Sequence, residues 1–557
     1  MSGTIDKDIA RPATLPARSS QGVVLGLDPW QVSTLLLAGA VLLISVQVYG
    51  PVGVISGGLI GVALAVASVV RYRGMSLPRW GAVWMNKKTR DALGATKETF
   101  APEAAQPTRV GALRLPGRLA SVEIWEVGDL AAVYDPHGRS ITVMAELEVP
   151  GFLMKDLYER MELADRWAMV LASFTQRPGV KRVAMQERTF PATIRPARDY
   201  FEEHKGNLSV PSADERYQAV MDKAEGFAVA HRNYLTLTYD LLKLSGQLKA
   251  LGGGKAAAVR LAALEAGNIR DALAGAEVEV RRWLGPRDIA ALARTAFDPA
   301  SIPVIENRTG SEAGVDPVAM GPTYMEEPKN NLGIVHTDSG VHTTMWIHEW
   351  PRAAAPIGFV NDLVFARHPV DNTAISHIFT TVMTPVPITE AFKRIKREKK
   401  TWRANQRMKA RRGEDGNAID TADFVALQAQ EDGLVSGHGE YRYGGYLTVT
   451  AATEEELEQS IAGVRNALSR AGMEAQILYA QQGEALLINA LPIGLGLKRP
   501  TARATWQRST RSLPIAASGP RDRSSASTST QTACSASPRG SRTTTKASEA
   551  PCRPTSS

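Results

Sequence analysis

The glycine-rich string "LGGGKA", which ends at Ala256, is the nearest approach in this sequence to a phosphate-binding loop. A loop of the GxxxxGK[ST] type needs a glycine five residues before Gly254, and Lys249 occupies that position. It also needs a hydroxyl group after Lys255 to bind magnesium, and Ala256 has none. We therefore expect this loop to open a helix without binding ATP. We expect no catalytic residues and no cofactor.

The nine histidines do not form a pattern typical of a metal site. His336, His342 and His348 are spaced six apart, and two of them on one strand would lie roughly 20 Å from each other. The two cysteines, Cys534 and Cys552, stand near the C-terminal end. The sequence before them therefore excludes a disulfide scaffold, a cysteine-ligated zinc site and a cysteine nucleophile.

The strongest charge feature is a basic string from Lys393 to Arg412, in a chain with a formal net charge of +8. Lys or Arg occupies more than half of its positions, Glu398 is its one acid, and Trp402 interrupts it. Such a helix could meet the phosphates of nucleic acid, anionic lipid headgroups or an acidic partner. The alternative is a solvated surface helix. The candidate contact residues are Lys396, Arg397, Lys399, Lys400 and Arg403.

Two charge-free apolar runs near the start, 32–48 and 52–70, are each close to the roughly 20 residues that a membrane-spanning helix needs. Only Tyr49, Gly50 and Pro51 separate them, which predicts a transmembrane helical hairpin over 31–70. Small residues four apart on the second run let backbones approach closely, either within the hairpin or between copies of the chain. They are Gly53, Gly57, Gly61 and Ala65.

Basic residues flank both ends of this hairpin, and its turn has no charge. Because basic flanks stay inside, we expect a multi-pass protein of the cell membrane with both termini cytoplasmic, including the N-terminal segment 1–30. A cleaved signal peptide fits less well, since a second apolar run follows the first at once. The flanking cations are Lys7, Arg11, Arg18, Arg71, Arg73 and Arg79.

The rest of the chain alternates strand-like and helix-like patterns, which predicts an α+β fold. We place a juxtamembrane linker at 71–118, a first α+β unit at 119–300, a loop linker at 301–335 and a second unit at 336–497. The string "YLTLT" at Tyr234 and the string "YLTVT" at Tyr446 are each followed by a similar amphipathic helix. This indicates two duplicated ferredoxin-like (split βαβ) units, the alternative being chance similarity. The Ser/Thr/Arg-rich segment 498–557 is expected to be disordered.

Several longer strings, in this order along roughly residues 20–497, resemble a family of actinobacterial membrane proteins encoded beside a conjugation-type ATPase. The soluble part is similar to the N-terminal, pre-ATPase region of the VirB/TraC/TrbE class of type IV secretion ATPases. The strings are "QGVVLGLDPWQV" at Gln21, "AVYDPHGRSITVMAEL" at Ala132, "WLGPRDIAALARTAFDP" at Trp283, "HTTMWIHEWPR" at His342, "LVSGHGEYRYGGYLTV" at Leu434 and "LYAQQGEALLINALPIGLGL" at Leu478.

The resemblance implies a structural, non-catalytic component of a type IV secretion or conjugation apparatus. Its partners would be a separately encoded VirB/TraC-like ATPase, other membrane subunits and further copies of the chain. The chain departs from the family at Ser19, Ser20 and Gln21, where arginines are usual, and in continuing beyond "LPIGLGL". A membrane component of type VII secretion of the EccE kind, and an enzyme with an unrecognised site, are the alternatives.

Overall fold

The computed structural model describes residues 29–72, 75–99, 113–128, 130–148, 154–177, 179–205, 211–225, 228–351, 357–411, 418–495 and 502–504. It confirms a mixed helix-and-sheet fold that begins with one long apolar helix. The expected cytoplasmic segment 1–30 lies almost wholly outside the described residues. So does nearly all of the tail 498–557.

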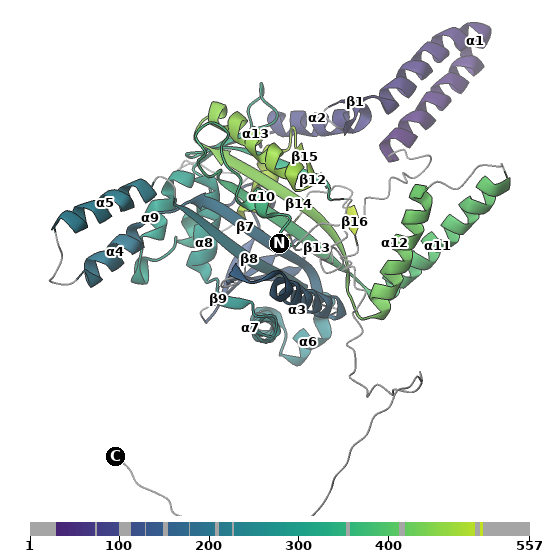
Figure 1. The fold of residues 1–557 in the computed structure, drawn as a ribbon. Helices are drawn as coiled ribbons and strands as arrows, with labels where there is room; N and C mark the ends of the chain where they lie inside the picture. Colours follow the sequence, from purple (N-terminus) through teal and green to yellow (C-terminus); the bar gives the residue numbers. More distant parts are fainter. Residues whose placement is uncertain are drawn as a thin grey trace, which may run out of the picture. The chain divides into compact units, whose positions relative to one another are not determined.

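The first helix, α1 (Pro29–Val69), is interrupted at Gly50, whose φ of 58° and ψ of −140° are not helical. The two halves lie side by side (Figure 1): the Gln31 side-chain amide donates to the Ser68 carbonyl at 2.7 Å, and the Ser45 hydroxyl donates to the Gly53 carbonyl at 2.9 Å. By length and composition, Gln31–Val69 could cross a membrane. The interruption falls within the turn expected at residues 49–51.

A short ordered region connects α1 to the body. It holds β1 (Arg71–Tyr72), β2 (Met75–Ser76), α2 (Leu77–Ala92) and β3 (Lys97–Thr99). The rings of Tyr72 and Trp80 stack at 6.0 Å. At the end of α2, Arg90 donates to Glu327 at 2.7 Å and to the Ala480 carbonyl at 2.7 Å, which fixes α2 to the body. The interval predicted as a juxtamembrane linker thus contains a docked helix and three short strands.

Within the described residues, fourteen strands form one sheet whose neighbours are all antiparallel. The central order is β9-β6-β8-β7-β13-β14-β12-β15. Its other strands extend both ends or pair with β14. The strands beyond β3 are β4 (Glu123–Val127), β5 (Leu130–Asp135), β6 (Ser140–Glu148), β7 (Val180–Pro191), β8 (Val229–Asp240), β9 (Glu279–Trp283), β10 (Tyr324–Glu326), β11 (Val335–Thr337), β12 (Val341–Glu349), β13 (His377–Val386), β14 (Glu440–Ala451), β15 (Glu474–Ile477) and β16 (Ala502–Ala504).

The two halves of this sheet have the same strand order. Each half has four central strands. When they are counted in chain order within the half, the fourth pairs with the first, the first with the third, and the third with the second: β9-β6-β8-β7 and β15-β12-β14-β13. The second strands of the two halves, β7 and β13, pair with each other and join the halves. Their pairing runs from Val183 opposite Met383 to Thr189 opposite His377. The register is symmetric about this seam, the junction of β7 and β13. One row of paired residues reads Arg282, Glu146, Tyr234, Gln186, Thr380, Tyr446, Trp346 and Gln476.

Helices cover both faces of the sheet (Figure 1). On one face, α3 (Leu157–Gln176) and α7 (Gly254–Ala274) pack on the first half, and α13 (Glu454–Arg470) packs on the second. On the other face lie α8 (Pro286–Phe297) and α14 (Gln482–Ala490). These helices bury the alternating apolar side chains of the strands, which is the main stabilising term.

Each half carries a helical pair between its second and third strands. In the first half these helices are α4 (Arg195–His204) and α5 (Pro211–Glu225), and in the second they are α11 (Ile388–Arg411) and α12 (Ala418–Val435). The remaining short helices are α6 (Ser245–Ala250), α9 (Ile302–Glu306) and α10 (Asn361–Val364). The interval 301–335, expected to be loop, contains α9, β10 and the start of β11, so part of it extends the sheet.

Candidate functional site

The small-residue stripe of α1 faces the first half of the same helix. A methyl group on Gly53 would lie 2.5 Å from the Ser45 carbonyl carbon, and one on Gly57 would lie 2.5 Å from the Ser45 Cβ. A methyl group on Gly61 would lie 3.5 Å from the Ala38 carbonyl oxygen, an ordinary contact. Ala65, the last member of the stripe, accepts the Ser68 hydroxyl on its own carbonyl. The close approaches at Gly53 and Gly57 are therefore used within α1.

The basic helix predicted at Lys393 forms α11, and its residues divide between two faces. Ala391 and Ile395 are buried in a small apolar cluster with Val386 and Leu434. Trp402 stacks on Phe424 of α12 at 4.2 Å. The tryptophan in the basic string therefore holds the helical pair together and does not face outward.

Not every cation of α11 is available to a partner. Lys399 forms an ion pair with Glu431, and its side chain is only 14% exposed. Arg394 binds Glu440 at 3.0 Å and Glu398 at 2.7 Å. Of the five candidate contact residues, Lys399 thus belongs to the α11–α12 contact, and the other four are exposed.

Most of the exposed cations of α11 are spaced three or four residues apart, so they share one side of the helix. Over the 18 steps from Lys393 to Arg411, at about 1.5 Å each, they cover roughly 27 Å of its length. We call this set the basic stripe. It consists of Lys393, Lys396, Arg397, Lys400, Arg403, Arg407 and Arg411.

The glycine string before Lys255 forms the start of α7, as expected. Gly252, Gly253 and Gly254 all have positive φ angles, of 94°, 72° and 69°, a conformation that glycine adopts without strain. The Lys255 ammonium lies 5.0 Å from the centre of the Trp125 ring. The lysine is therefore placed against an aromatic side chain of β4.

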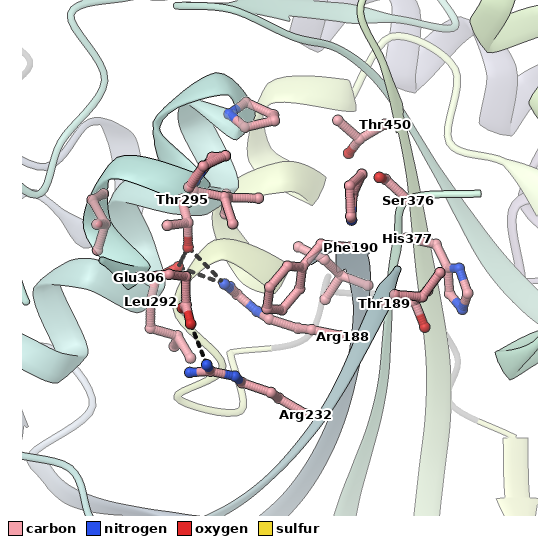
Figure 2. A pocket seen from close by; sticks show the side chains of 18 of the residues that line it. Arg188, Thr189, Phe190, Arg232, Leu292, Thr295, Glu306, Ser376, His377 and Thr450 are labelled. Atoms are coloured by element: carbon pink, nitrogen blue, oxygen red, sulfur yellow. Dashed lines mark hydrogen bonds and ion pairs between the residues drawn. The ribbon is translucent and has the colours of Figure 1, made fainter. Parts of the chain in front are cut away.

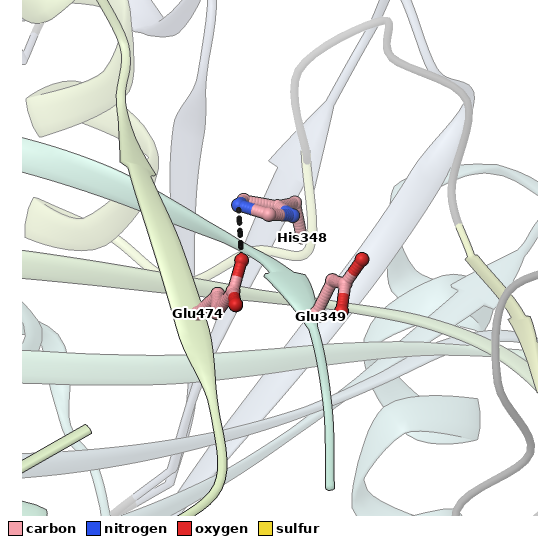
Figure 3. Close-up of side chains that lie close together, drawn as sticks. All are labelled: His348, Glu349 and Glu474. Atoms are coloured by element: carbon pink, nitrogen blue, oxygen red, sulfur yellow. Dashed lines mark ion pairs between the residues drawn. The ribbon is translucent and has the colours of Figure 1, made fainter. Parts of the chain in front are cut away.

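The histidines spaced six apart have separate partners. His336 lies 3.2 Å from Glu454, while buried His342 hydrogen-bonds to Thr337 at 2.7 Å. His348 approaches Glu349 and Glu474 closely enough for one cation to reach all three (Figure 3). The Nε2 atom of His348 is already 3.6 Å from the Glu474 carboxylate, whose side chain is 67% exposed. This surface ion pair accounts for the cluster, and we assign no metal to it.

A cavity of about 790 Å³ lies against the face of the sheet that α8 covers, between β7, β8, β9, α8 and α9, and its wall also includes residues of β13, β14 and α13 (Figure 2). Its wall is partly apolar, with Leu292, Ile302 and Ile305 all buried. Arginines approach it from three strands of the first half of the sheet. They are Arg188 on β7, Arg232 on β8, and Arg281 and Arg282 on β9.

Most of these arginines are neutralised by carboxylates. Arg232 pairs with Glu306 of α9. Arg282 binds Glu146 at 2.7 Å and Asp288 at 2.8 Å. The Glu146 side chain is only 3% exposed and accepts from β9 across the strand pair, so it balances the cations on that strand.

Arg188 is different, because its partners are all uncharged. The residue is 5% exposed and donates to the Gln186 side chain at 2.9 Å, the Leu292 carbonyl at 2.7 Å and the Ala490 carbonyl at 3.2 Å. Ala490 ends α14, so its carbonyl carries part of the negative end of the helix dipole. Burial lowers the pKa of Arg188 to about 10, which still leaves it protonated at neutral pH.

The residue next to Arg188 on β7 sits in a second polar cluster, at the end of the seam. Glu187 lies 3.3 Å from the Nδ1 of His231 and 3.4 Å from the Nε2 of His377, and Thr189 donates to it at 2.6 Å. Burial alone would raise the pKa of Glu187, but hydrogen bonds from His231, His377 and Thr189 lower it to about 2. The carboxylate is therefore ionised at neutral pH.

Sequence reasoning singled out neither the cavity nor this cluster. The signal was present as charged residues inside strands that otherwise read as apolar, in "MQERTF" at Met185 and "RNYLTLT" at Arg232. A buried strand position occupied by arginine or glutamate must find a partner, because an isolated charge is costly to bury. The chain matches no protein-family model and no curated protein.

Proposed function

We propose that this protein is a membrane-anchored, non-catalytic component of a type IV, conjugation-like secretion apparatus. In this proposal its soluble part is a cytoplasmic platform for a separately encoded VirB/TraC-like ATPase. The observation that carries the proposal is the folding of α1 back on itself at Gly50. The choice of apparatus comes from the resemblance of several strings, in the same order along the chain, to proteins of conjugation loci.

The dimensions of α1 favour two passes through a membrane. As one straight helix, 41 residues would reach about 60 Å, roughly twice the hydrocarbon thickness of a bilayer. Folded at Gly50, each half has about the 20 residues that one pass needs. Its large apolar side chains are mostly exposed, for example Leu36 at 70% and Leu59 at 71%, as expected for side chains that meet lipid.

We also propose that the body is a duplicated split-βαβ unit. The support is the shared strand order and the placing of Tyr234 and Tyr446 at equivalent points of one row. The halves differ in one connection: α3 follows the first strand of the first half, whereas the second half has only α10 there within the described residues. A paired, continuous sheet with helical pairs at equivalent positions suits a scaffold that presents surfaces to partners.

The basic stripe is the surface that we assign to an anionic partner, and the ATPase is the partner that the proposed role favours. Each exposed charge contributes little alone, so the stripe acts through the sum of its cations. DNA and anionic lipid headgroups offer the same chemistry, and the binding experiment below tests them separately.

Membrane topology tests the anchor. With Cys534 and Cys552 replaced by serine, a membrane-impermeant maleimide applied to intact cells should label Tyr49→Cys. It should not label Leu93→Cys, whose position is 81% exposed, until the cells are permeabilised. Labelling of Leu93→Cys in intact cells, or protection of Tyr49→Cys under both conditions, contradicts two passes with cytoplasmic ends.

Binding tests the platform. The variant with Gln at Lys396, Arg397, Lys400 and Arg403 removes four charges while keeping helix propensity. Co-purification with the neighbouring ATPase should fall, and the remaining binding should depend less on salt. The control removes four exposed cations from the topologically equivalent pair α4–α5, at Arg195, Lys205, Arg216 and Lys223. Equal binding by both variants contradicts a role for the stripe. If the variant of the stripe keeps its binding to the ATPase but loses binding to DNA or to anionic vesicles, the stripe is assigned to that partner instead.

A further inference from the structure

The two halves of the sheet differ sharply in charge around the cavity. On the face that carries Tyr234 and Tyr446, equivalent positions follow from the symmetric register. Arg188 is two residues beyond Gln186, and its counterpart, two residues beyond Thr380, is Val382. The first half has Glu146, Arg188, Arg232 and Arg282, and the second half has Trp346, Val382, Gly444 and Gln476 at the same places.

The second half is filled at this point. Val382 packs in an apolar cluster with Trp346, Tyr446 and Ile488. The 790 Å³ cavity lies instead beside the charged positions of the first half, and its wall contains the buried Arg188 as well as residues of β13 and β14 (Figure 2). The duplicated architecture therefore does not require the charges or the space, since the same architecture closes over apolar side chains on the other side.

The charge of Arg188 is only partly balanced. Its four hydrogen-bond acceptors are a side-chain amide, the Thr295 hydroxyl and two carbonyl oxygens, and no carboxylate pairs with it among the described residues. A buried cation without an anion is costly, and an anion that enters the cavity would reduce that cost. Arg232 stands beside it, held by Glu306, whose side chain is 26% exposed and can be displaced by a competing anion.

We propose that this cavity binds a small organic anion, with a carboxylate or phosphate group between Arg188 and Arg232 and an apolar body against α8 and α9. Guanidinium groups bind both oxyanions through charge-assisted N–H donation, and Arg188, with four acceptors on its five N–H groups, adds its charge and one further N–H. The cavity volume is within the range typical of small-molecule sites. Leu292, Ile302 and Ile305 provide the apolar wall. The inference does not depend on the proposed role in secretion.

Binding to the full chain in non-ionic detergent tests the proposal by isothermal titration at low salt. The probes are phenyl phosphate and benzoate, with benzyl alcohol as an uncharged ligand of similar size. We expect saturable binding of at least one anion, and binding of benzyl alcohol weaker by about tenfold or more, the effect of one charge-assisted hydrogen bond. The stronger of the two anions identifies the head group. If neither anion binds at up to about 10 mM, the proposal is wrong.

Variants locate the site. Glu306→Gln leaves Arg232 with the longer 3.9 Å ion pair to Glu146 and should tighten anion binding, whereas Arg188→Met should weaken it by about tenfold or more. Arg270→Gln, on α7 at the opposite face of the sheet, changes the net charge equally and should have no effect. Unfolding midpoints establish that each variant is folded. If Arg188→Met does not fold, Glu306→Gln decides: unchanged affinity in that variant overturns the proposal.

Discussion

Replacing Gly53 by alanine should separate the two halves of α1. The added methyl group would stand 2.5 Å from the Ser45 carbonyl carbon and closer still to its oxygen. Carbon atoms in contact prefer 3.5 Å or more, so the halves must move apart by about 1 Å at this point. The neighbour is backbone, which cannot rotate away as a side chain could. Overpacking of this kind costs about 1–3 kcal/mol, and the hydrogen bond from Ser45 to Gly53 is strained as well.

Gly61→Ala is the matched control, because its methyl group would meet the Ala38 carbonyl oxygen at an ordinary 3.5 Å. Both substitutions add one methyl group to the same half of α1 and raise helix propensity equally. The separation is measured by crosslinking Leu42→Cys to Gly58→Cys with a short bis-maleimide, in protein lacking Cys534 and Cys552. The Leu42 side chain lies 4.0 Å from the Cβ position of Gly58, so the pair reports closure near the turn.

We expect Gly53→Ala to reduce the crosslinking yield and the unfolding temperature in detergent, and Gly61→Ala to change neither. Equal behaviour of the two variants would refute the packing of the halves through Gly53. Loss of closure in both would place the tight contact elsewhere along α1. The result bears on helix packing alone, so it holds whether or not α1 spans a membrane.

Three further predictions concern the body. The free energy of unfolding should fall as the pH drops from about 4.5 to about 2, because the lowered pKa of Glu187 means that its ionised form stabilises the fold. This contribution is about 3 kcal/mol above pH 4.5 and is lost as the carboxylate is protonated. Glu187→Gln should flatten this part of the pH profile of unfolding, and an unchanged profile would contradict the prediction. The purified protein should not hydrolyse ATP, and turnover abolished by Lys255→Ala would contradict this. Thr453→Ala should cost about 1 kcal/mol in denaturant unfolding, since the Thr453 hydroxyl caps α13 by accepting from the Glu456 amide at 3.2 Å, and Thr453→Ser should restore it.

Local patterns predicted the elements that carry a strong period. The strand-like pattern around Tyr234 and Tyr446 identified the central strands β8 and β14. The basic string identified α11. In the interval 301–335, by contrast, β10 and β11 have only three residues each, too few to show an alternating pattern.

The candidate contact residues on α11 could be read only in part from the sequence. The density of basic residues identified five candidates, of which the structure leaves Lys396, Arg397, Lys400 and Arg403 exposed. Spacing could not show that Lys399 meets Glu431, because that contact depends on how α12 folds back from 32 residues away. Pairings between distant segments are set by tertiary packing, on which helical periodicity carries no information.

The cavity shows the same limit at the level of the whole sheet. Alternation in β7 indicates that Gln186 and Arg188 share a face, but not what covers that face. That depends on the seam, where β7 pairs with β13 across nearly 200 residues of chain. The seam also removes a liability, because β7 and β13 would otherwise expose long unpaired edges. Once the two edges meet, apolar side chains fill the space on the second-half side of the seam, whereas on the first-half side Arg188, Arg232 and Arg282 line a cavity. The arginine cavity is thus a property of how the halves differ, which neither half's sequence pattern contains alone.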